Sequence, residues 1–191
     1  LYRSLQVVGV LRPETLRWIH TDGGPLRMDQ LGDIYQLHWY AEKLGATDQA
    51  DIDLLTQNLR LHSWYVQVRG NRGREPNKEN MQLSAPTLPE RWLANEEAFR
   101  FIFRRDSGLS PGLFLDQRAN RRMLHLLKPR AVLNLFSYTG GFSVAAAKAG
   151  AERVVTVDIS RKFLEWAKEN FRANSLDPEN KNFEFRDIDS Q

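Results

Sequence analysis

The spacing of apolar and polar residues changes along the chain and divides it into two parts. In the first part, short runs of β-branched and aromatic residues predict strands over 14–20, 34–40 and 64–68. Apolar residues at helical spacing predict a helix over 48–61, capped by Thr47 or Asp48. Residues 70–89 are rich in Gly, Pro, Asn and charge, which is typical of a boundary. We therefore expect a smaller α/β or α+β domain over 1–92 and a second domain over 93–191.

In the second part, apolar runs alternate with helical patterns. Buried parallel strands are predicted over 131–135, 153–157 and 182–186. Helices are predicted between them over 142–149 and from Ser160 to about Asn174, and a basic helix over 118–127 precedes them. A hairpin is predicted from strands over 98–103 and 113–115. The order β-α-β-α-β predicts an α/β fold, the first half of an open parallel Rossmann-like sheet.

Polar or glycine-bearing loops follow each of these three strands, over 136–141, 158–160 and 187–189. In open parallel sheets, ligands bind beyond the carboxyl ends of the strands. Asp158, which follows Gly140 by 18 residues, can accept both hydroxyls of an adenosine ribose, and Asp187 can accept the adenine amino group. The three loops together predict a slot for adenosine.

The glycines and the aspartates of this slot each have an alternative explanation that involves no ligand. Glycines in such a turn also allow close packing of helix on strand, and an aspartate at a strand end often caps a helix. Residues 138–143 read Tyr-Thr-Gly-Gly-Phe-Ser, which lacks the Gly-x-Gly-x-x-Gly spacing that cradles a diphosphate. This favours S-adenosylmethionine over a nicotinamide dinucleotide, and a dinucleotide-dependent oxidoreductase is the less favoured enzyme interpretation.

The composition and the charge distribution indicate which kinds of partner the protein can bind. Of the 191 residues, 41% are hydrophobic and 27% charged, and the net charge is +3. Residues 98–130 hold eight basic and two acidic side chains, net +6, which indicates a footprint for a polyanion. We take Arg121 and Arg122 as its candidate phosphate contacts. The alternative is that these arginines pair with acidic residues of 1–62. The chain has no cysteine, which fits a reducing compartment such as the cytoplasm. It also has no apolar run long enough to span a membrane. The four scattered histidines predict no metal site.

Two motifs are specific enough to indicate a family. The segment 134–143 reads Asn-Leu-Phe-Ser-Tyr-Thr-Gly-Gly-Phe-Ser, and 112–118 reads Gly-Leu-Phe-Leu-Asp-Gln-Arg. With Val157-Asp158, they resemble the class I S-adenosylmethionine-dependent methyltransferases that modify 23S ribosomal RNA, including the 5-methylcytosine enzymes of the large subunit. The resemblance is strong over 93–191 and weaker over 14–92, where it implies a domain that helps to form the RNA-binding surface.

The resemblance implies a set of cofactor contacts. Gln117 and Arg118 approach from the side of the predicted hairpin, Asp158 takes the ribose hydroxyls, and Asp187 with Ile188 holds the adenine. The remaining implied contacts belong to the two loops nearest the ribose and methionine: Phe136, Ser137, Tyr138, Thr139, Gly140, Gly141, Ile159 and Ser160.

A complete sheet of this kind has more strands than the three predicted here, and a buried strand left at an open edge is unfavourable. We therefore expect residues beyond Gln191, or another chain such as a second copy in a homodimer, to complete the sheet. Catalytic residues are expected in that missing part, and the 191-residue segment alone is expected to be inactive. The non-enzymatic alternative is an RNA-binding protein that has the methyltransferase fold but no catalytic activity.

Overall fold

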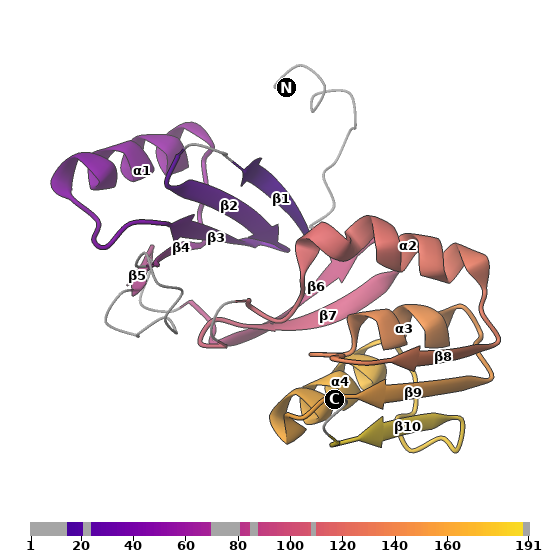
Figure 1. Ribbon diagram of the computed structural model, residues 1–191. Coiled ribbons are helices and arrows are strands. Elements are labelled where there is room, and N and C mark those ends of the chain that lie inside the picture. The colour runs from indigo at the N-terminus through magenta and orange to yellow at the C-terminus, as the bar shows by residue number, and fades with distance from the viewer. Residues whose placement is uncertain (1–14, 21–23, 70–80, 85–87, 108–109, 189–191) are drawn as a thin grey trace. The chain divides into compact units, whose positions relative to one another are not determined.

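The structure divides the chain into two compact units, Leu1–Leu88 and Pro89–Gln191 (Figure 1). It is a computed structural model that describes residues 15–20, 24–69, 81–84, 88–107 and 110–188. The boundary that the sequence predicts after residue 92 falls within β6 (Arg91–Glu96), whose partner strand belongs to the second unit. Unit 1 contains one sheet and unit 2 contains two, and each unit is described separately.

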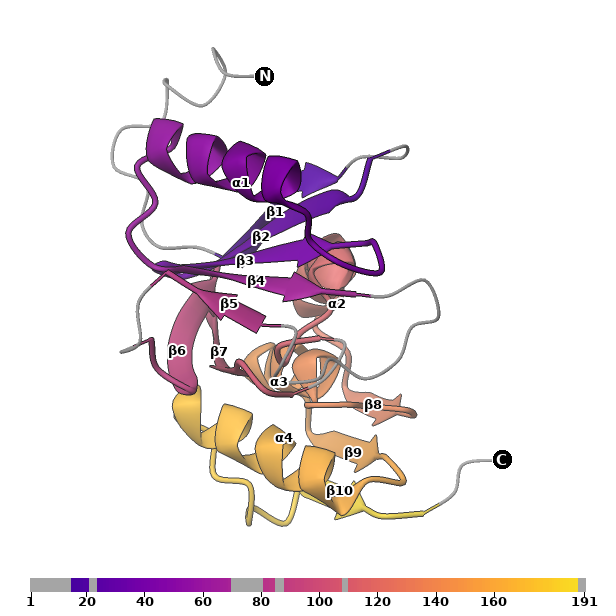
Figure 2. The same cartoon turned by 90° about the vertical axis from the view of Figure 1, so that its left-hand side faces the viewer.

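Unit 1 is a five-stranded sheet in the order β1-β2-β3-β4-β5. Helix α1 (Ala46–Asn58) connects the parallel pair β3 and β4 and lies across one face of the sheet (Figure 2). The strands are β1 (Thr15–His20), β2 (Leu26–Leu31), β3 (Ile34–Trp39), β4 (Trp64–Val68) and β5 (Met81–Leu83). The predicted strands and helix are present. Sequence reasoning missed β2 and β5, because β2 carries Arg27, Asp29 and Gln30 and does not look apolar.

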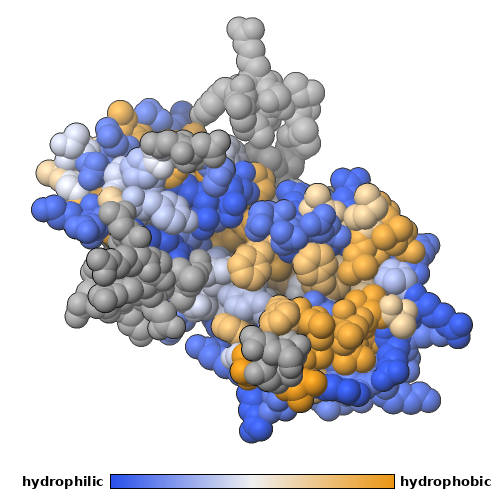
Figure 3. Space-filling model, viewed as in Figure 1, coloured by the Kyte–Doolittle hydropathy of each residue, from blue (hydrophilic) through white to orange (hydrophobic). Residues whose placement is uncertain are grey.

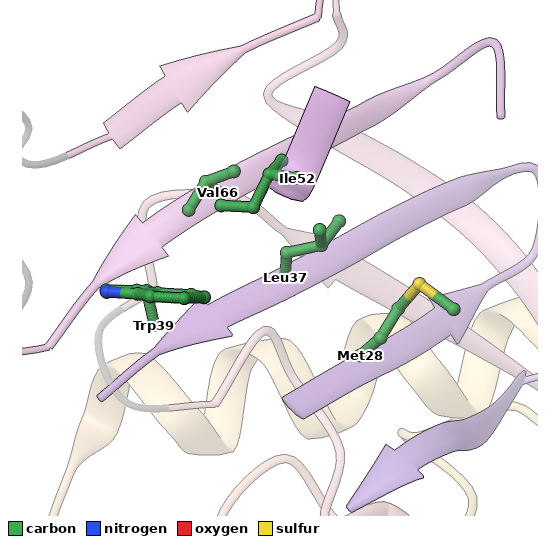
Figure 4. Close-up of a cluster of buried hydrophobic side chains, with 5 residues drawn as sticks. All are labelled: Met28, Leu37, Trp39, Ile52 and Val66. Atoms are coloured by element: carbon green, nitrogen blue, oxygen red, sulfur yellow. The ribbon is translucent and has the colours of Figure 1, made fainter. Parts of the chain in front are cut away.

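The core of unit 1 lies between α1 and the sheet. Its side chains come from the helix and from the three central strands (Figure 4): Met28, Leu37, Trp39, Ile52 and Val66. The predicted cap is wrong in one detail. Gly45 is the capping residue, and its backbone N–H donates to the Asp48 carboxylate at 2.9 Å, so Asp48 stabilises the first turn from within the helix.

The sheet face opposite α1 is polar and includes the fully buried His38. Arg69 Nε donates to His38 Nδ1 at 2.8 Å, and His38 Nε2 lies 3.4 Å from the Asp29 carboxylate. Burial, together with the charges of Arg27 and Arg69, lowers the pKa of His38 to about 4, against the opposing effect of Asp29. His38 is therefore neutral in the folded protein at neutral pH.

This pKa predicts an acid-sensitive unit 1. Below pH 6.5 the unfolded chain takes up a proton at this histidine, whereas folded His38 stays neutral until about pH 4. The free energy of unfolding should therefore fall as the pH drops through this window, by roughly 3 kcal/mol at most. Urea denaturation at several pH values between 7.5 and 4 measures this. A His38→Gln variant should flatten the dependence, and an unchanged slope in that variant would contradict the assignment.

Unit 2 contains a three-stranded parallel sheet in the order β10-β9-β8. Its strands are β8 (Ala131–Asn134), β9 (Arg153–Val157) and β10 (Phe183–Arg186). The helices are α2 (Arg118–Leu127), which the short 3₁₀ helix η2 (Leu115–Gln117) precedes, α3 (Gly141–Lys148) and α4 (Arg161–Ala173). The predicted β-α-β-α-β order and the parallel sheet are confirmed. Among the described residues, no helix is long and apolar enough to cross a membrane.

The predicted hairpin in unit 2 is wrong. Strand β7 (Phe99–Arg104) pairs antiparallel with β6, which precedes it, and 113–115 forms no strand. The actual turn is at Glu97, whose φ is 53°. The glycines and proline of 108–112 suggested a hairpin turn, but the segment 110–114 leads into η2 and meets the end of β7 at Pro111, whose carbonyl accepts from the Arg104 N–H at 2.8 Å. This change places 110–114 beside the loop that follows β8.

Strand β8 is much more exposed than the sequence predicts. The face that includes Asn134 is covered, since Ser143 of α3 accepts a hydrogen bond from Asn134 at 2.9 Å. On the other face, the side chain of Leu133 is 62% exposed. Within the described part of the chain, β8 and β10 are the two edge strands of this sheet. Apolar side chains gather on the visible face over α2 and β8 (Figure 3), including Met123, Leu126, Leu127 and Leu133.

Candidate functional site

The carboxyl ends of β8, β9 and β10 lie side by side, as the sequence predicts. The backbone N–H of Ser137, just after β8, donates to Val157 O at 2.9 Å. The N–H of Asp158 donates to Arg186 O at 3.2 Å. These contacts bring the three predicted polar loops to one edge of the sheet, where parallel α/β proteins bind ligands.

The loop after β8 has an unusual backbone. Phe136, Tyr138 and Gly140 have φ values of 53°, 51° and 75°. Positive φ is uncommon for residues other than glycine and costs free energy, so such a loop persists only when its surroundings hold it. The loop is held by side chains of the β9 tip and of α4 and by backbone carbonyls of 110–114.

Both loop glycines are explained by internal packing. A Cβ added to Gly140 would lie 2.8 Å from Ala167 Cβ on α4, and one added to Gly141 would lie 2.9 Å from Leu113 Cδ1. The alternative that these glycines allow close packing therefore has direct support. Their presence alone does not argue for a ligand.

Asp158 joins the β9 tip to the loop after β8. Its Oδ2 accepts from the Tyr138 N–H at 2.8 Å, and its Oδ1 accepts from the Ser160 N–H at 2.9 Å. Ser160 in turn caps α4 by accepting from the Phe163 N–H at 3.4 Å. Each carboxylate oxygen of Asp158 has a further lone pair, so the residue can hold the loop and still accept hydrogen bonds from a ligand.

The tips of β9 and β10 expose apolar side chains. Ile159 is 73% exposed and Ile188 is 51% exposed. Beside them, the exposed carboxylate of Asp187 forms an ion pair with Arg161, whose hydrogen bond holds the pKa of Asp187 below its usual range. Two apolar side chains and a carboxylate suit a flat, polar-edged ring. Sequence reasoning did not include Arg161.

Tyr138 and Thr139 tie the loop to the segment 110–114. The Tyr138 hydroxyl donates to Ser110 O at 2.8 Å, and the Thr139 hydroxyl donates to Gly112 O. Burial raises the pKa of Tyr138 to about 12, so its hydroxyl keeps its proton at neutral pH. The Tyr138 ring lies 5.2 Å from that of Phe114. These contacts depend on the path of 110–114, which the predicted hairpin misplaced.

A hollow of about 140 Å³ lies between 110–114 and the loop. Its walls are formed by Leu113, Phe114, Arg121, Phe142, Gly141 and the residues 134–139. Gln117 and Arg118 lie at the start of α2 and form other contacts. Gln117 accepts from Asn120 at 2.8 Å, and Arg118 Nε lies 3.3 Å from Glu97. The structure therefore brings together the loop residues, Asp158 and Ser160, whereas Gln117 bonds to Asn120 and Arg118 pairs with Glu97 at the start of α2.

The basic stretch is largely neutralised, and the prediction for Arg121 is wrong. The Arg121 side chain is buried, and its guanidinium donates to both oxygens of Glu96, at 2.7 and 2.6 Å. Other arginines pair with acids of the same unit: Arg104 with Glu169, Arg118 with Glu97 and Arg130 with Glu152. These acidic residues lie outside 98–130 and also outside 1–62. The pairing therefore matches neither of the two interpretations from the sequence, contact with phosphate or pairing with acidic residues of 1–62. Arg122 stays accessible, with its side chain 65% exposed.

The described residues contain no group of three or more His, Cys, Asp or Glu side chains that could hold a metal ion. The site therefore consists of a strained loop, a carboxylate that holds it, exposed isoleucines and a small hollow. These features suit an organic ligand that carries an adenosine and a short polar tail.

Known proteins resemble this chain in sequence and in fold. The ribosomal RNA large subunit methyltransferase K/L of Shewanella oneidensis is 47% identical over 98 residues, which are 51% of this chain and 14% of that protein. A methyltransferase solved in complex with SAH (S-adenosylhomocysteine) has a TM-score of 0.83 at 26% identity, over 99% of this chain and 49% of its own. A SAM-dependent methyltransferase from Agrobacterium tumefaciens has a TM-score of 0.68 at 26% identity, over 95% of this chain and 54% of its own.

The chain thus spans about a seventh of the curated relative and about half of the solved structures. A family model for S-adenosylmethionine-dependent methyltransferases matches residues 65–188. This match covers the whole of unit 2 up to the tip of β10, including every loop of the site. Of the two enzyme interpretations, it supports the methyltransferase and argues against the dinucleotide-dependent oxidoreductase. The chain belongs to the S-adenosylmethionine-dependent methyltransferase family.

Proposed function

We propose that unit 2 binds S-adenosylmethionine at the tips of β8, β9 and β10, and that the protein methylates RNA, with ribosomal RNA as its substrate class. The observation that carries the cofactor part is the position of Asp158. Its carboxylate stands at the junction of two strand tips, holds the neighbouring loop and has free lone pairs. When bound, the cofactor supplies a methyl group on an electrophilic sulfonium.

The residues present fit such a cofactor. Asp158 would accept from the ribose hydroxyls, with Ser160 beside it. Ile159 and Ile188, both exposed, would contact the faces of the adenine, and Asp187 would accept from its amino group. The hollow at the other end of the loop would receive the methionine part, against the loop residues Phe136, Ser137, Tyr138, Thr139, Gly140 and Gly141. Gln117 and Arg118 would reach it from the start of α2.

These residues would do little acid–base chemistry. Methyl transfer mainly needs the nucleophile, the methyl carbon and the leaving sulfur to be held in line. The loop of residues 136–141 is well suited to holding a ligand, because hydrogen bonds from three directions fix it. In this proposal the chain's share of the reaction is to bind and orient the cofactor.

The RNA part of the proposal is supported by the Shewanella relative, whose name states a ribosomal RNA substrate. We propose that unit 1 contributes to the RNA-binding surface and that Arg122 contacts phosphate. An enzyme acting on ribosomal RNA works where ribosomes are assembled, so the cytoplasm is the expected compartment. A homodimer that pairs along the exposed edge of β8 is the proposed form of self-association.

The RNA proposal predicts a salt effect at Arg122. Binding of a single-stranded ribosomal RNA fragment should weaken as salt rises, and Arg122→Gln should lower the slope of log K against log[salt] by about 0.7 for one lost phosphate contact. Fluorescence anisotropy at several salt concentrations measures the slope. Arg130→Gln is the control, because Arg130 is also exposed but is held by a closer ion pair, 2.6 Å from Glu152 against 3.9 Å between Arg122 and Glu97. Equal slopes in the wild type and the Arg122 variant would exclude the contact.

A further inference from the structure

One buried amide connects α4, the β6–β7 hairpin and the loop of the site. Asn170 on α4 is fully buried. Its Oδ1 accepts from the Ile102 N–H at 2.9 Å, and its Nδ2 donates to Thr139 O at 2.9 Å. Both ends of the side-chain amide are therefore used, one on β7 and one on the loop.

The peptide group between Thr139 and Gly140 is hydrogen-bonded at both ends. The carbonyl of Thr139 and the N–H of Gly140 belong to the same peptide group, and that N–H donates to Ser137 O at 2.9 Å. A hydrogen bond at each end of a planar peptide fixes its orientation. Because Tyr138 and Gly140 on either side have positive φ, this plane decides how the loop turns toward the ligand.

Neighbouring side chains of α4 support the same arrangement. Trp166 Nε1 donates to Ile102 O at 3.1 Å, so α4 binds both backbone polar groups of Ile102. Ala167 is the residue against which Gly140 packs. The inner face of α4 thus forms a rigid support under the loop.

We propose that Asn170 is a positioning residue for cofactor binding: by holding the Thr139–Gly140 peptide, it fixes the loop in the conformation that receives S-adenosylmethionine. This rests on the proposed cofactor site. Asn170 does not itself touch the ligand in this account. Its effect passes through the loop.

The chain offers a matched control one helical turn away. Asn174 is also buried, its Oδ1 accepts from the Arg100 N–H at 2.9 Å, and its Nδ2 donates to Arg100 O at 2.7 Å. It therefore binds the same hairpin, and its Nδ2 also donates to Asn170 O at 2.7 Å, but it has no hydrogen bond to the loop. Replacement of either residue by Asp keeps the acceptor and removes the amide donor. Asn170→Asp takes the donor from Thr139 O, whereas Asn174→Asp takes it from Arg100 O and Asn170 O.

The experiment compares Asn170→Asp with Asn174→Asp in the full 191-residue chain. Calorimetry with S-adenosylhomocysteine, well below the melting temperature of each variant, gives the affinity. Hydrogen exchange of peptides covering 136–142 in the ligand-free chain gives the order of the loop. Asn170→Asp should weaken affinity about tenfold and speed loop exchange, since one hydrogen bond to a buried carbonyl is lost. Asn174→Asp should change affinity by less than about twofold at a similar loss of stability.

The outcomes separate this proposal from the cofactor site itself. Wild-type chain that fails to bind S-adenosylhomocysteine would refute the cofactor site, while faster loop exchange in Asn170→Asp alone would still support positioning of the loop. Equal loop exchange and equal affinity losses in the two Asp variants would overturn the role of Asn170. The pair Asn170→Ala and Asn174→Ala, which removes the side-chain donor and acceptor at each position without placing a charge in the core, gives the same comparison if the Asp variants do not fold.

Discussion

Arg121→Ala should destabilise unit 2 by about 3–5 kcal/mol, because it leaves a buried carboxylate without its partner. Glu96 and Arg121 are each 1% exposed and form two charge-assisted hydrogen bonds. Arg121 also donates to Phe114 O at 2.9 Å, which helps to hold 110–114 against the site. Since a whole domain is stable by only about 5–15 kcal/mol, the variant should unfold at a much lower temperature or denaturant concentration.

Denaturation of the wild type, Arg121→Ala and a double Arg121→Met, Glu96→Leu variant tests this expectation. The double variant removes both charges and should recover much of the lost stability, because the desolvation cost disappears with the pair. A loss below about 1 kcal/mol in Arg121→Ala would show that the side chain is solvated, and would return it to the list of candidate phosphate contacts.

Asp158→Ala should weaken the binding of S-adenosylhomocysteine by about 1.5–3 kcal/mol, which is about 10- to 150-fold. Two effects contribute. The ribose loses its acceptor, and the loop loses the bond from the Tyr138 N–H to the carboxylate, which is 2.8 Å long. The melting temperature should also fall, since the Ser160 N–H loses its acceptor as well.

A double cycle separates these two effects. The wild type and Asp158→Ala are each titrated with S-adenosylhomocysteine and with its 2′-deoxy analogue. If the carboxylate binds the ribose, loss of the hydroxyl should cost affinity in the wild type and little in the variant. If removal of the hydroxyl costs the same affinity in both proteins, Asp158 does not bind the ribose and only holds the loop.

The parallel half of the fold follows from local patterns. Residues 153–157 read Arg-Val-Val-Thr-Val, in which four β-branched residues favour a strand. The flanking helices have clear signals, such as the cap at Ser160, so strand, helix and order were predictable. Strand β2 was not, because Arg27 and Asp29 interrupt its apolar pattern, and β6 was not, because Arg91, Asn95 and Glu96 do the same there. The pairing of β7 with β6 depends on contacts between strands that a single segment does not show. The exposure of Leu133 likewise depends on which neighbours β8 has.

The site was predictable where the backbone topology alone decides proximity. Parallel strands end at one edge, so Asp158 and the loop of 136–141 had to lie close together. The fate of Arg121 was not predictable from its basic neighbours, because its partner Glu96 lies 25 residues away on another element. Asn170 gave a weak signal that could have been used: it is a polar residue three positions after Ala167, on the apolar stripe of its helix.

The central claim is that the tips of β8, β9 and β10 bind S-adenosylmethionine, and titration calorimetry of the purified chain tests it most directly. The account predicts saturable binding of S-adenosylhomocysteine with one site per chain and no comparable binding of NAD, because the loop lacks the glycine spacing that holds a diphosphate. Failure to bind S-adenosylhomocysteine would contradict the account, and if the same chain still bound RNA, it would support an RNA-binding protein without catalysis.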